Sequence, residues 1–77
     1  ISLNPNPAKD YFTISNIGNE KINGITIYEI SGKKVFDTKK SFENQINIDV
    51  SNFARGIYLV EIVSENKSKL TKKLILK

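Results

Sequence analysis

The sequence predicts an all-β fold, an antiparallel β-sandwich of about seven short strands. The β-forming residues Ile, Val, Thr, Tyr and Phe total 27 of the 77 residues, whereas Ala, Leu and Gln together total 8. Apolar residues recur at every second position, and turn-forming residues interrupt these runs at intervals of roughly 8 to 12 residues, as in β-sandwiches. No window has a convincing helical pattern, so strands are expected nearly throughout.

Five runs alternate apolar with polar residues, and each is predicted to be a strand with one buried face. In chain order, the inward positions are Phe12 and Ile14; Ile25 and Ile27; Ile46, Ile48 and Val50; Tyr58, Val60 and Ile62; and Leu70, Leu74 and Leu76. The segments between the runs are rich in Asn, Gly, Ser and Pro, which suit tight turns. The predicted turns are residues 16–19, Asn23-Gly24 ahead of a strand, Ser31-Gly32 between two strands, residues 51–56, and Asn66-Lys67.

The length allows one hydrophobic core, so residues 1–77 are predicted to form a single domain. The chain opens on Ile1 rather than Met, and we expect it to be a piece cut from a larger protein. Its longest apolar stretch, residues 57–60, falls far short of the roughly 20 residues that span a bilayer, so no direct membrane insertion is expected.

The composition excludes most catalytic classes. The chain has no Cys and no His, so thiol nucleophiles, His general bases and the usual zinc ligands are absent. We expect no enzyme, no cofactor and no metal. The net charge of +4 comes largely from scattered Lys pairs rather than from Arg beside exposed aromatics, so we expect no nucleic-acid partner. Lysines on a solvated face that protect edge strands from aggregation explain the charge better.

Asn4-Pro5-Asn6-Pro7 is the most unusual local sequence. Two prolines fix φ and remove two backbone donors, so the stretch is predicted to be extended and to lie outside any central strand. It is either a turn that leads the chain into the sandwich or a stiff recognition segment. The turn is the plainer interpretation.

Two glycine-containing segments have structural interpretations. Ser31-Gly32-Lys33-Lys34 lacks the upstream glycine and the following helix of a phosphate loop, so it is predicted to be a hairpin turn with solvated lysines. In Gly56-Ile57-Tyr58, the Tyr ring could pack inside while its hydroxyl bonds a neighbouring loop, like the tyrosine corner of immunoglobulin-like sandwiches. We therefore expect a small immunoglobulin-like sandwich.

The polar candidates are weak. Nothing in the spacing of Glu61 with Glu65, or of Asp37 with Glu43, directs a carboxylate pair to one cleft. Asp10, Asn47 and Asp49 could offer oxygen ligands to calcium, but no known calcium-loop pattern is present. Residues 66–68 fit a glycosylation sequon and are more simply a turn.

Four blocks in order carry a family resemblance: residues 4–10, 25–35, 56–62 and 72–77. Together they resemble, over essentially the whole chain, the C-terminal sorting domain of proteins exported by the type IX secretion system of Bacteroidetes-type bacteria. The resemblance implies a signal that acts while folded in the periplasm and is recognised by the outer-membrane translocon. A cell-surface peptidase then removes it and often joins the cargo to lipopolysaccharide. The cargo would reach the outer membrane surface or be secreted.

By position, the resemblance implies structural motif roles for eight residues: Pro5, Asn6, Pro7, Ala8, Gly32, Lys33, Gly56 and Tyr58. The position before Pro5 is often aromatic in the family and is Asn4 here, which weakens any claim of a specific contact there. The last run alternates apolar residues with Lys and Thr, as a peripheral strand would. A receptor could add a strand beside it or match its ammonium groups with acidic side chains. The residues expected to carry this recognition are Lys72, Lys73, Leu74 and Lys77.

Two other classes of function stay open from the sequence. One is an adhesion or carbohydrate-binding module of a secreted enzyme, which would need a solvent-facing aromatic platform from Tyr11 and either Phe36 or Phe42. The other is a structural spacer. The sequence also leaves open self-association through an open sheet edge.

Overall fold

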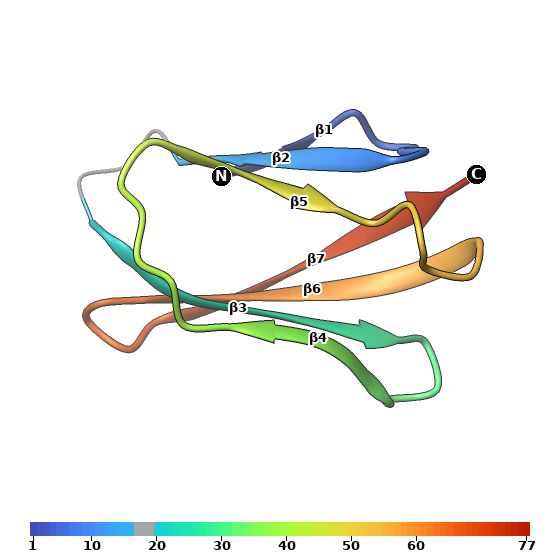
Figure 1. Cartoon of the computed structure of the whole chain (residues 1–77). Coiled ribbons are helices and arrows are strands. Elements are labelled where there is room, and N and C mark those ends of the chain that lie inside the picture. The colour runs from blue at the N-terminus through green and yellow to red at the C-terminus, as the bar shows by residue number, and fades with distance from the viewer. Residues whose placement is uncertain (17–19) are drawn as a thin grey trace.

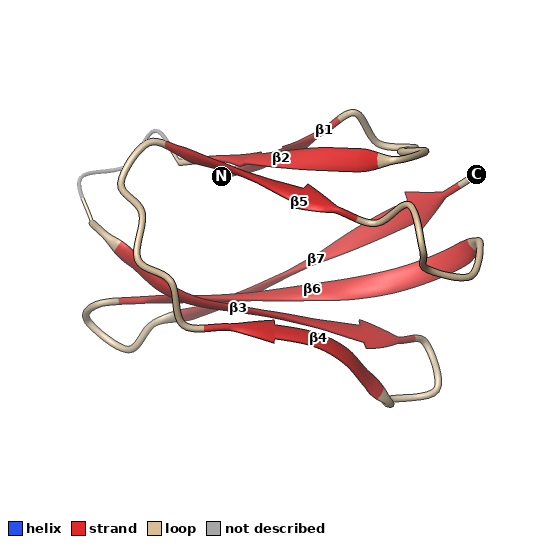
Figure 2. Ribbon diagram, viewed as in Figure 1, coloured by secondary structure: helices blue, strands red, loops and turns tan. Residues whose placement is uncertain are grey.

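The computed structural model describes residues 1–16 and 20–77, which form seven strands (Figure 1). In chain order they are β1 (Ser2–Asn4), β2 (Tyr11–Ser15), β3 (Ile22–Glu29), β4 (Lys34–Thr38), β5 (Gln45–Asp49), β6 (Gly56–Ser64) and β7 (Lys69–Leu76). The predicted all-β fold is therefore confirmed, and the described residues contain strands, turns and loops without a helix (Figure 2). None of them accordingly forms a helix long and apolar enough to cross a membrane.

The strands form two packed antiparallel sheets, a β-sandwich. One sheet has the order β1-β2-β5 and the other has the order β4-β3-β6-β7. The sheets lie one above the other in Figure 1, with principal extents of 32 × 22 × 17 Å. The edge strands are β1 and β5 in the first sheet and β4 and β7 in the second.

The core is built from the alternate positions that face the space between the sheets. Its buried members are Leu3, Ala8, Phe12, Ile14, Ile22, Ile25, Ile27, Ile48, Val50, Tyr58, Val60, Ile62, Leu74 and Leu76. Burying an Ile or Leu side chain contributes about 1.5–3 kcal/mol relative to leaving it exposed. No described polar or charged residue is buried, so the apolar side chains dominate the packing between the sheets.

One predicted inward residue departs from this pattern. Leu70 has the same parity in β7 as the buried Leu74 and Leu76, yet 41% of its surface is exposed. It lies at the start of an edge strand and lines a hollow with Ile1, so part of its surface meets solvent.

The predicted turn at Asn23-Gly24 is wrong, because both residues lie inside β3. The register of β3 against β6 shifts between Ile22 and Gly24. A β-bulge accommodates an extra residue, and glycine inside a strand commonly marks such a site. The Asn-Gly pair therefore marks a β-bulge rather than a turn.

The other described turns agree with the sequence prediction. Gly32 has φ 98° between β3 and β4, a conformation that glycine adopts without steric penalty. Residues 50–55 connect β5 to β6, and Gly56 begins β6. Between β6 and β7 it is Lys67, not Asn66, that takes the positive φ, 70°. The predicted turn at residues 16–19 lies largely outside the described residues.

The proline motif forms a bend. Residues 5–7 follow β1 and curve, and Ala8 then makes a bridge to Leu76 of the other sheet. The expectation of an extended segment is therefore wrong, because these residues must cross from one sheet to the other within a few positions. The expectation that they lie outside a central strand is confirmed.

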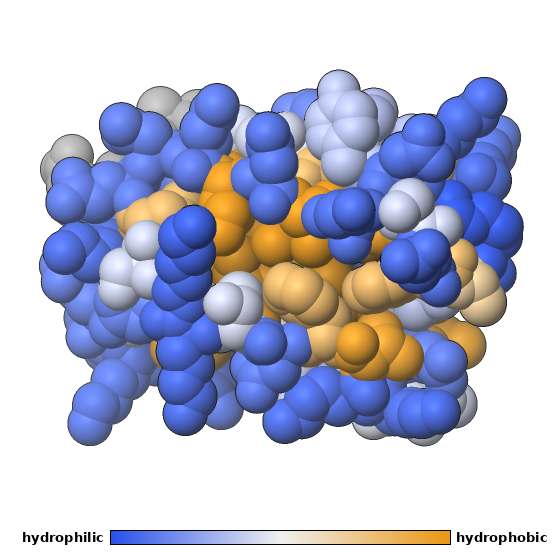
Figure 3. Space-filling model, in the orientation of Figure 1, coloured by the Kyte–Doolittle hydropathy of each residue, from blue (hydrophilic) through white to orange (hydrophobic). Residues whose placement is uncertain are grey.

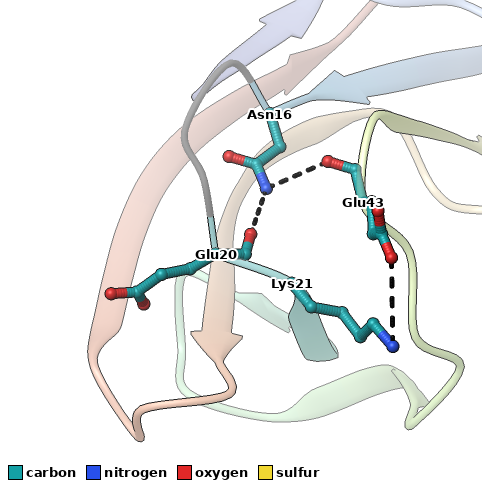
Figure 4. A network of polar contacts seen from close by, with 4 residues as sticks. All are labelled: Asn16, Glu20, Lys21 and Glu43. Carbon is teal, nitrogen blue, oxygen red and sulfur yellow. Dashed lines mark hydrogen bonds and ion pairs between the residues drawn. The ribbon is translucent and has the colours of Figure 1, made fainter.

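A network of polar contacts joins the loop between β4 and β5 to the residues around Asn16 and Lys21 (Figure 4). The Asn16 side chain donates from Nδ2 to the carbonyl oxygens of Glu20 at 2.7 Å and Glu43 at 3.2 Å. The Lys21 ammonium lies 4.0 Å from Glu43 Oε1. Beside them, Ile22 and Phe42 exchange backbone hydrogen bonds of 2.9 and 3.0 Å. These contacts hold the loop between β4 and β5 against the start of β3.

An apolar strip faces the viewer between the edges of β5 and β4 (Figure 3). Several side chains of β4, β5 and their neighbouring loops are only partly buried against the core; they are Val35, Phe36, Phe42, Ile46 and Phe53. The two sheets are therefore more open to solvent on this side than at their centre.

Candidate functional site

Strand β7 is a basic edge strand. It carries Lys69, Lys72 and Lys73, Lys77 follows directly, and residues 69–77 contain no acidic side chain. The two ion pairs among the described residues are Lys21–Glu43 and Lys34–Asp37, so the lysines of this segment join neither. The prediction that the last run is a peripheral strand is confirmed by the sheet order, in which β7 stands at the end of the sheet beside β6.

Residues 6–8 cover the outer edge of β7 over residues 73–77. The Asn6 side chain donates from Nδ2 to the Lys73 carbonyl at 2.9 Å and accepts the Ile75 amide at 3.0 Å. The Ala8 amide then donates to the Ile75 carbonyl at 2.8 Å, and the Lys77 amide donates to the Ala8 carbonyl at 2.9 Å. We call these four bonds the latch. Through the latch, one loop of the three-stranded sheet seals half of an edge of the other sheet.

The latch also shows which backbone groups of β7 face outward. The bonded groups belong to Lys73, Ile75 and Lys77. Because backbone groups of alternate residues point to the same side of a strand, Lys69 and Thr71 present their amides and carbonyls to the same outer edge. We call residues 69–73 the free half of the β7 edge, since within the described part of the chain only one of their outward groups, the Lys73 carbonyl, is bonded by the latch.

The four expected recognition residues lie in different environments. Lys73 is exposed, whereas Lys72 has the parity of the core positions and is half-buried. Lys77 is exposed and bonds Ala8 through its amide. Leu74 is fully buried, so its side chain is part of the core. Lys72 and Lys73 consequently face opposite sides of the strand.

The motif residues named from the resemblance have visible structural contacts. Tyr58 is 4% exposed, and its hydroxyl donates to the Ala54 carbonyl, four residues upstream. Its ring also packs against Phe53 with centroids 5.8 Å apart. The predicted bond from this hydroxyl to a neighbouring loop is therefore confirmed. Gly32 supplies the positive φ of the β3–β4 hairpin, and Lys33 accepts the Glu29 amide at 2.8 Å through its carbonyl.

Sequence reasoning missed Arg55. Its guanidinium donates to the carbonyls of Lys9, Val50 and Phe53, at 2.7 Å for Val50 and 2.8 Å for the shorter Phe53 contact. The fork of N–H groups lets one side chain hold a loop and a distant turn together. Its one available signal is compositional, since it is the single Arg among the 12 cationic residues.

The oxygen-rich residues near β5 bond within the chain. Asp10, Asn47 and Asp49 line one hollow, but Asn47 Oδ1 accepts the Thr13 hydroxyl and Asp49 Oδ1 accepts the Ser51 amide and hydroxyl at 2.9 and 2.7 Å. The Ser51 hydroxyl and amide lower the pKa of Asp49 from its ordinary value of 3.8. Across the described residues, no group of three or more acidic side chains is arranged to hold a metal.

The remaining candidates are dispersed. Asp37 lies near Lys34 within β4, and Glu43 lies near Lys21 in a different part of the chain, so the two carboxylates are paired separately. Phe36 and Phe42 pack partly against the core, and Phe36 lies 6.5 Å from Phe53 between ring centroids, so these rings do not form a flat exposed platform with Tyr11. Asn66 forms part of a turn, where its amide donates to Glu20 Oε1 at 2.7 Å.

The sequence of the chain is similar to a family model and to known proteins. Residues 2–77 match the sequence model described as the secretion system C-terminal sorting domain. The chain is 41% identical over 82 residues to an endo-acting ulvan lyase of Formosa agariphila, covering 100% of this chain and 15% of that protein. It is 35% identical over 78 residues to ulvan lyase NLR42 of Nonlabens ulvanivorans, covering 97% of this chain and 14% of that protein. The chain thus spans a small fraction of the length of these relatives.

Proposed function

Because the chain belongs to the C-terminal sorting domains of the type IX (Por) secretion system, we propose that it is an export signal read in its folded form by the outer-membrane translocon. The observation that carries this proposal is the basic edge strand β7, whose lysines join neither of the two ion pairs found in residues 1–16 and 20–77. A receptor that recognises a folded domain needs a surface of defined shape and charge. Lys72, Lys73 and Lys77 supply that charge, and Leu74 fixes the strand to the core.

We propose the following course for the parent protein. It folds in the periplasm, the translocon recognises this domain, and a cell-surface peptidase of the machinery removes it, with transfer of the cargo to lipopolysaccharide or release. The domain would be one unit, residues 1–77, of a larger secreted protein. The relatives named as ulvan lyases support a cargo of the ulvan lyase type. In this course the domain itself carries out no reaction.

Export of a reporter tests the proposal. The segment is fused through a short linker to a periplasmic fluorescent protein in a host that has the secretion system. We expect surface delivery that disappears in a translocon mutant. Retention of the fusion in the periplasm of the intact host would overturn the proposal.

Charge reversal separates recognition from folding. Lys72→Glu with Lys73→Glu is expected to reduce surface delivery while the folded domain persists, because the basic strand would then repel an acidic receptor. Lys39→Glu with Lys40→Glu is the matched control, since these adjacent lysines are exposed and lie outside β7. Equal surface delivery of the two variants would show that the lysines of β7 are not part of the recognition surface.

A further inference from the structure

We infer that the free half of the β7 edge, residues 69–73, accepts an extended segment of a partner protein in which acidic and apolar residues alternate. The inference rests on the proposed function, because the partner would belong to the export machinery. It goes further by assigning the binding mode, its limits along the strand and the chemistry of the partner.

The backbone supplies the first argument. Thr71 and Lys69 direct amides and carbonyls outward, and Lys73 directs its amide outward, whereas the latch occupies the outward groups from the Lys73 carbonyl to Lys77. An unpaired edge of this kind binds an extended peptide through main-chain hydrogen bonds. The latch therefore restricts strand addition to one half of β7.

A hollow beside the free half supplies the second argument. It has a volume of about 330 Å³, and its apolar wall comes from Ile1, Ile22, Ile62 and Leu70. Residues directly opposite each other on neighbouring strands point to the same face. A partner residue opposite Leu70 would therefore face this hollow, and an apolar side chain there would cover the exposed part of Leu70.

Charge supplies the third argument. Lys69 and Lys73 are exposed and share the outer face of the sheet with Thr71. Partner residues opposite them would point to the same face, where carboxylates would pair with the two ammonium groups. A second copy of this chain fits poorly, because pairing two β7 edges would bring rows of lysines together.

The test uses a backbone substitution in the reporter fusion. Thr71→Pro removes an outward amide at an edge position that tolerates proline, and Thr71→Val is the control that keeps the amide. We expect Thr71→Val to be delivered normally and Thr71→Pro to be delivered about tenfold less, the ratio that a loss of 1.4 kcal/mol in binding produces. Circular dichroism and thermal melting report whether each variant is folded.

A binding measurement on the unsubstituted chain holds even if Thr71→Pro fails to fold. The probe is the peptide acetyl-Glu-Val-Glu-Val-Glu-Val-amide, and its control replaces each Glu by Lys. We expect the acidic probe to slow hydrogen exchange of the Thr71 and Lys73 amides, with a smaller effect at high salt. The basic probe should have no such effect.

The outcomes separate this inference from the proposed function. Translocon-dependent delivery of the unsubstituted fusion, together with normal delivery of folded Thr71→Pro, would overturn the inference and leave the proposed function standing. Equal protection by both probes would overturn the charge-matched partner. Protection of these amides without any probe would also overturn the charge-matched partner. If the protection increases with protein concentration, the occupant is a second copy of the chain. If the protection requires residues upstream of Ile1, the occupant is part of the parent chain.

Discussion

Asn6 precedes Ile75 by 69 residues, and its side-chain oxygen accepts the Ile75 amide at 3.0 Å. The same side chain donates to the Lys73 carbonyl. One amide thus serves the two neighbouring outward groups of an edge strand as a short strand would. The consequence is a β7 edge with one sealed half and one free half.

Replacing Asn6 tests the latch. Asn6→Ala removes both side-chain bonds, and we expect the free energy of unfolding to fall by about 1 kcal/mol. Hydrogen exchange at the Ile75 amide should become faster, since its acceptor is lost. Asn4→Ala is the matched control, because Asn4 donates to Ser2 within the same strand. Unchanged exchange at Ile75 in Asn6→Ala would contradict the role assigned to the latch.

Tyr58→Phe tests the corner bond. The ring stays in the core while the bond from the hydroxyl to the Ala54 carbonyl is lost, so we expect chemical denaturation to show a loss of about 1–1.5 kcal/mol. Tyr11→Phe serves for comparison, because 54% of Tyr11 is exposed, and its effect should be close to zero. A Tyr58→Phe protein as stable as Tyr11→Phe would show that the bond adds nothing.

Arg55→Lys tests whether geometry or charge matters. Lys keeps the positive charge but has a single ammonium group, which cannot span the carbonyls of Lys9, Val50 and Phe53. We expect the midpoint of urea unfolding to drop, corresponding to about 1–2 kcal/mol. Arg55→Ala should cost a similar amount. Full stability in Arg55→Lys would assign the contribution to charge instead.

Leu74→Ala and Leu70→Ala separate a core position from a surface position on the same side of β7. Leu74 is fully buried and Leu70 is 41% exposed. We therefore expect Leu74→Ala to lose about 2–5 kcal/mol of stability, and Leu70→Ala to lose clearly less. Thermal or urea unfolding of the two variants measures this difference. Similar losses would show that Leu70 is as well packed as Leu74.

The core positions were predictable because they follow from local periodicity. Phe12, Ile14, Ile25 and Ile27 alternate with polar residues and are all fully buried. The same alternation predicted that Leu70 points inward. It carries no information about the neighbouring strands, so the hollow beside Leu70 at the sheet edge could not be predicted from it. The predicted turn at Asn23-Gly24 was wrong because an Asn-Gly pair is suited to a turn and to a bulge alike.

The site was less predictable because its contacts are distant in sequence. The lysines and the edge character of β7 are visible in a single run of residues, whereas the partners of Asn6 lie 67 and 69 residues away. No local pattern specifies such pairs. Arg55 likewise binds Lys9 across 46 residues, so its role depends on how the two loops meet in space.

The latch joins nearly the first and the very last residues of this segment. Because residues 73–77 leave the ribosome after everything else in it, a chain cut short before Ile75 has nothing for the Asn6 oxygen to accept. Such a copy would keep Lys69, Lys72 and Lys73 but would lack the latch bonds that involve Ile75 and Lys77. The sealed half of the β7 edge can therefore form only after the last strand of the segment has been synthesised, so residues from opposite ends of the sequence complete it together.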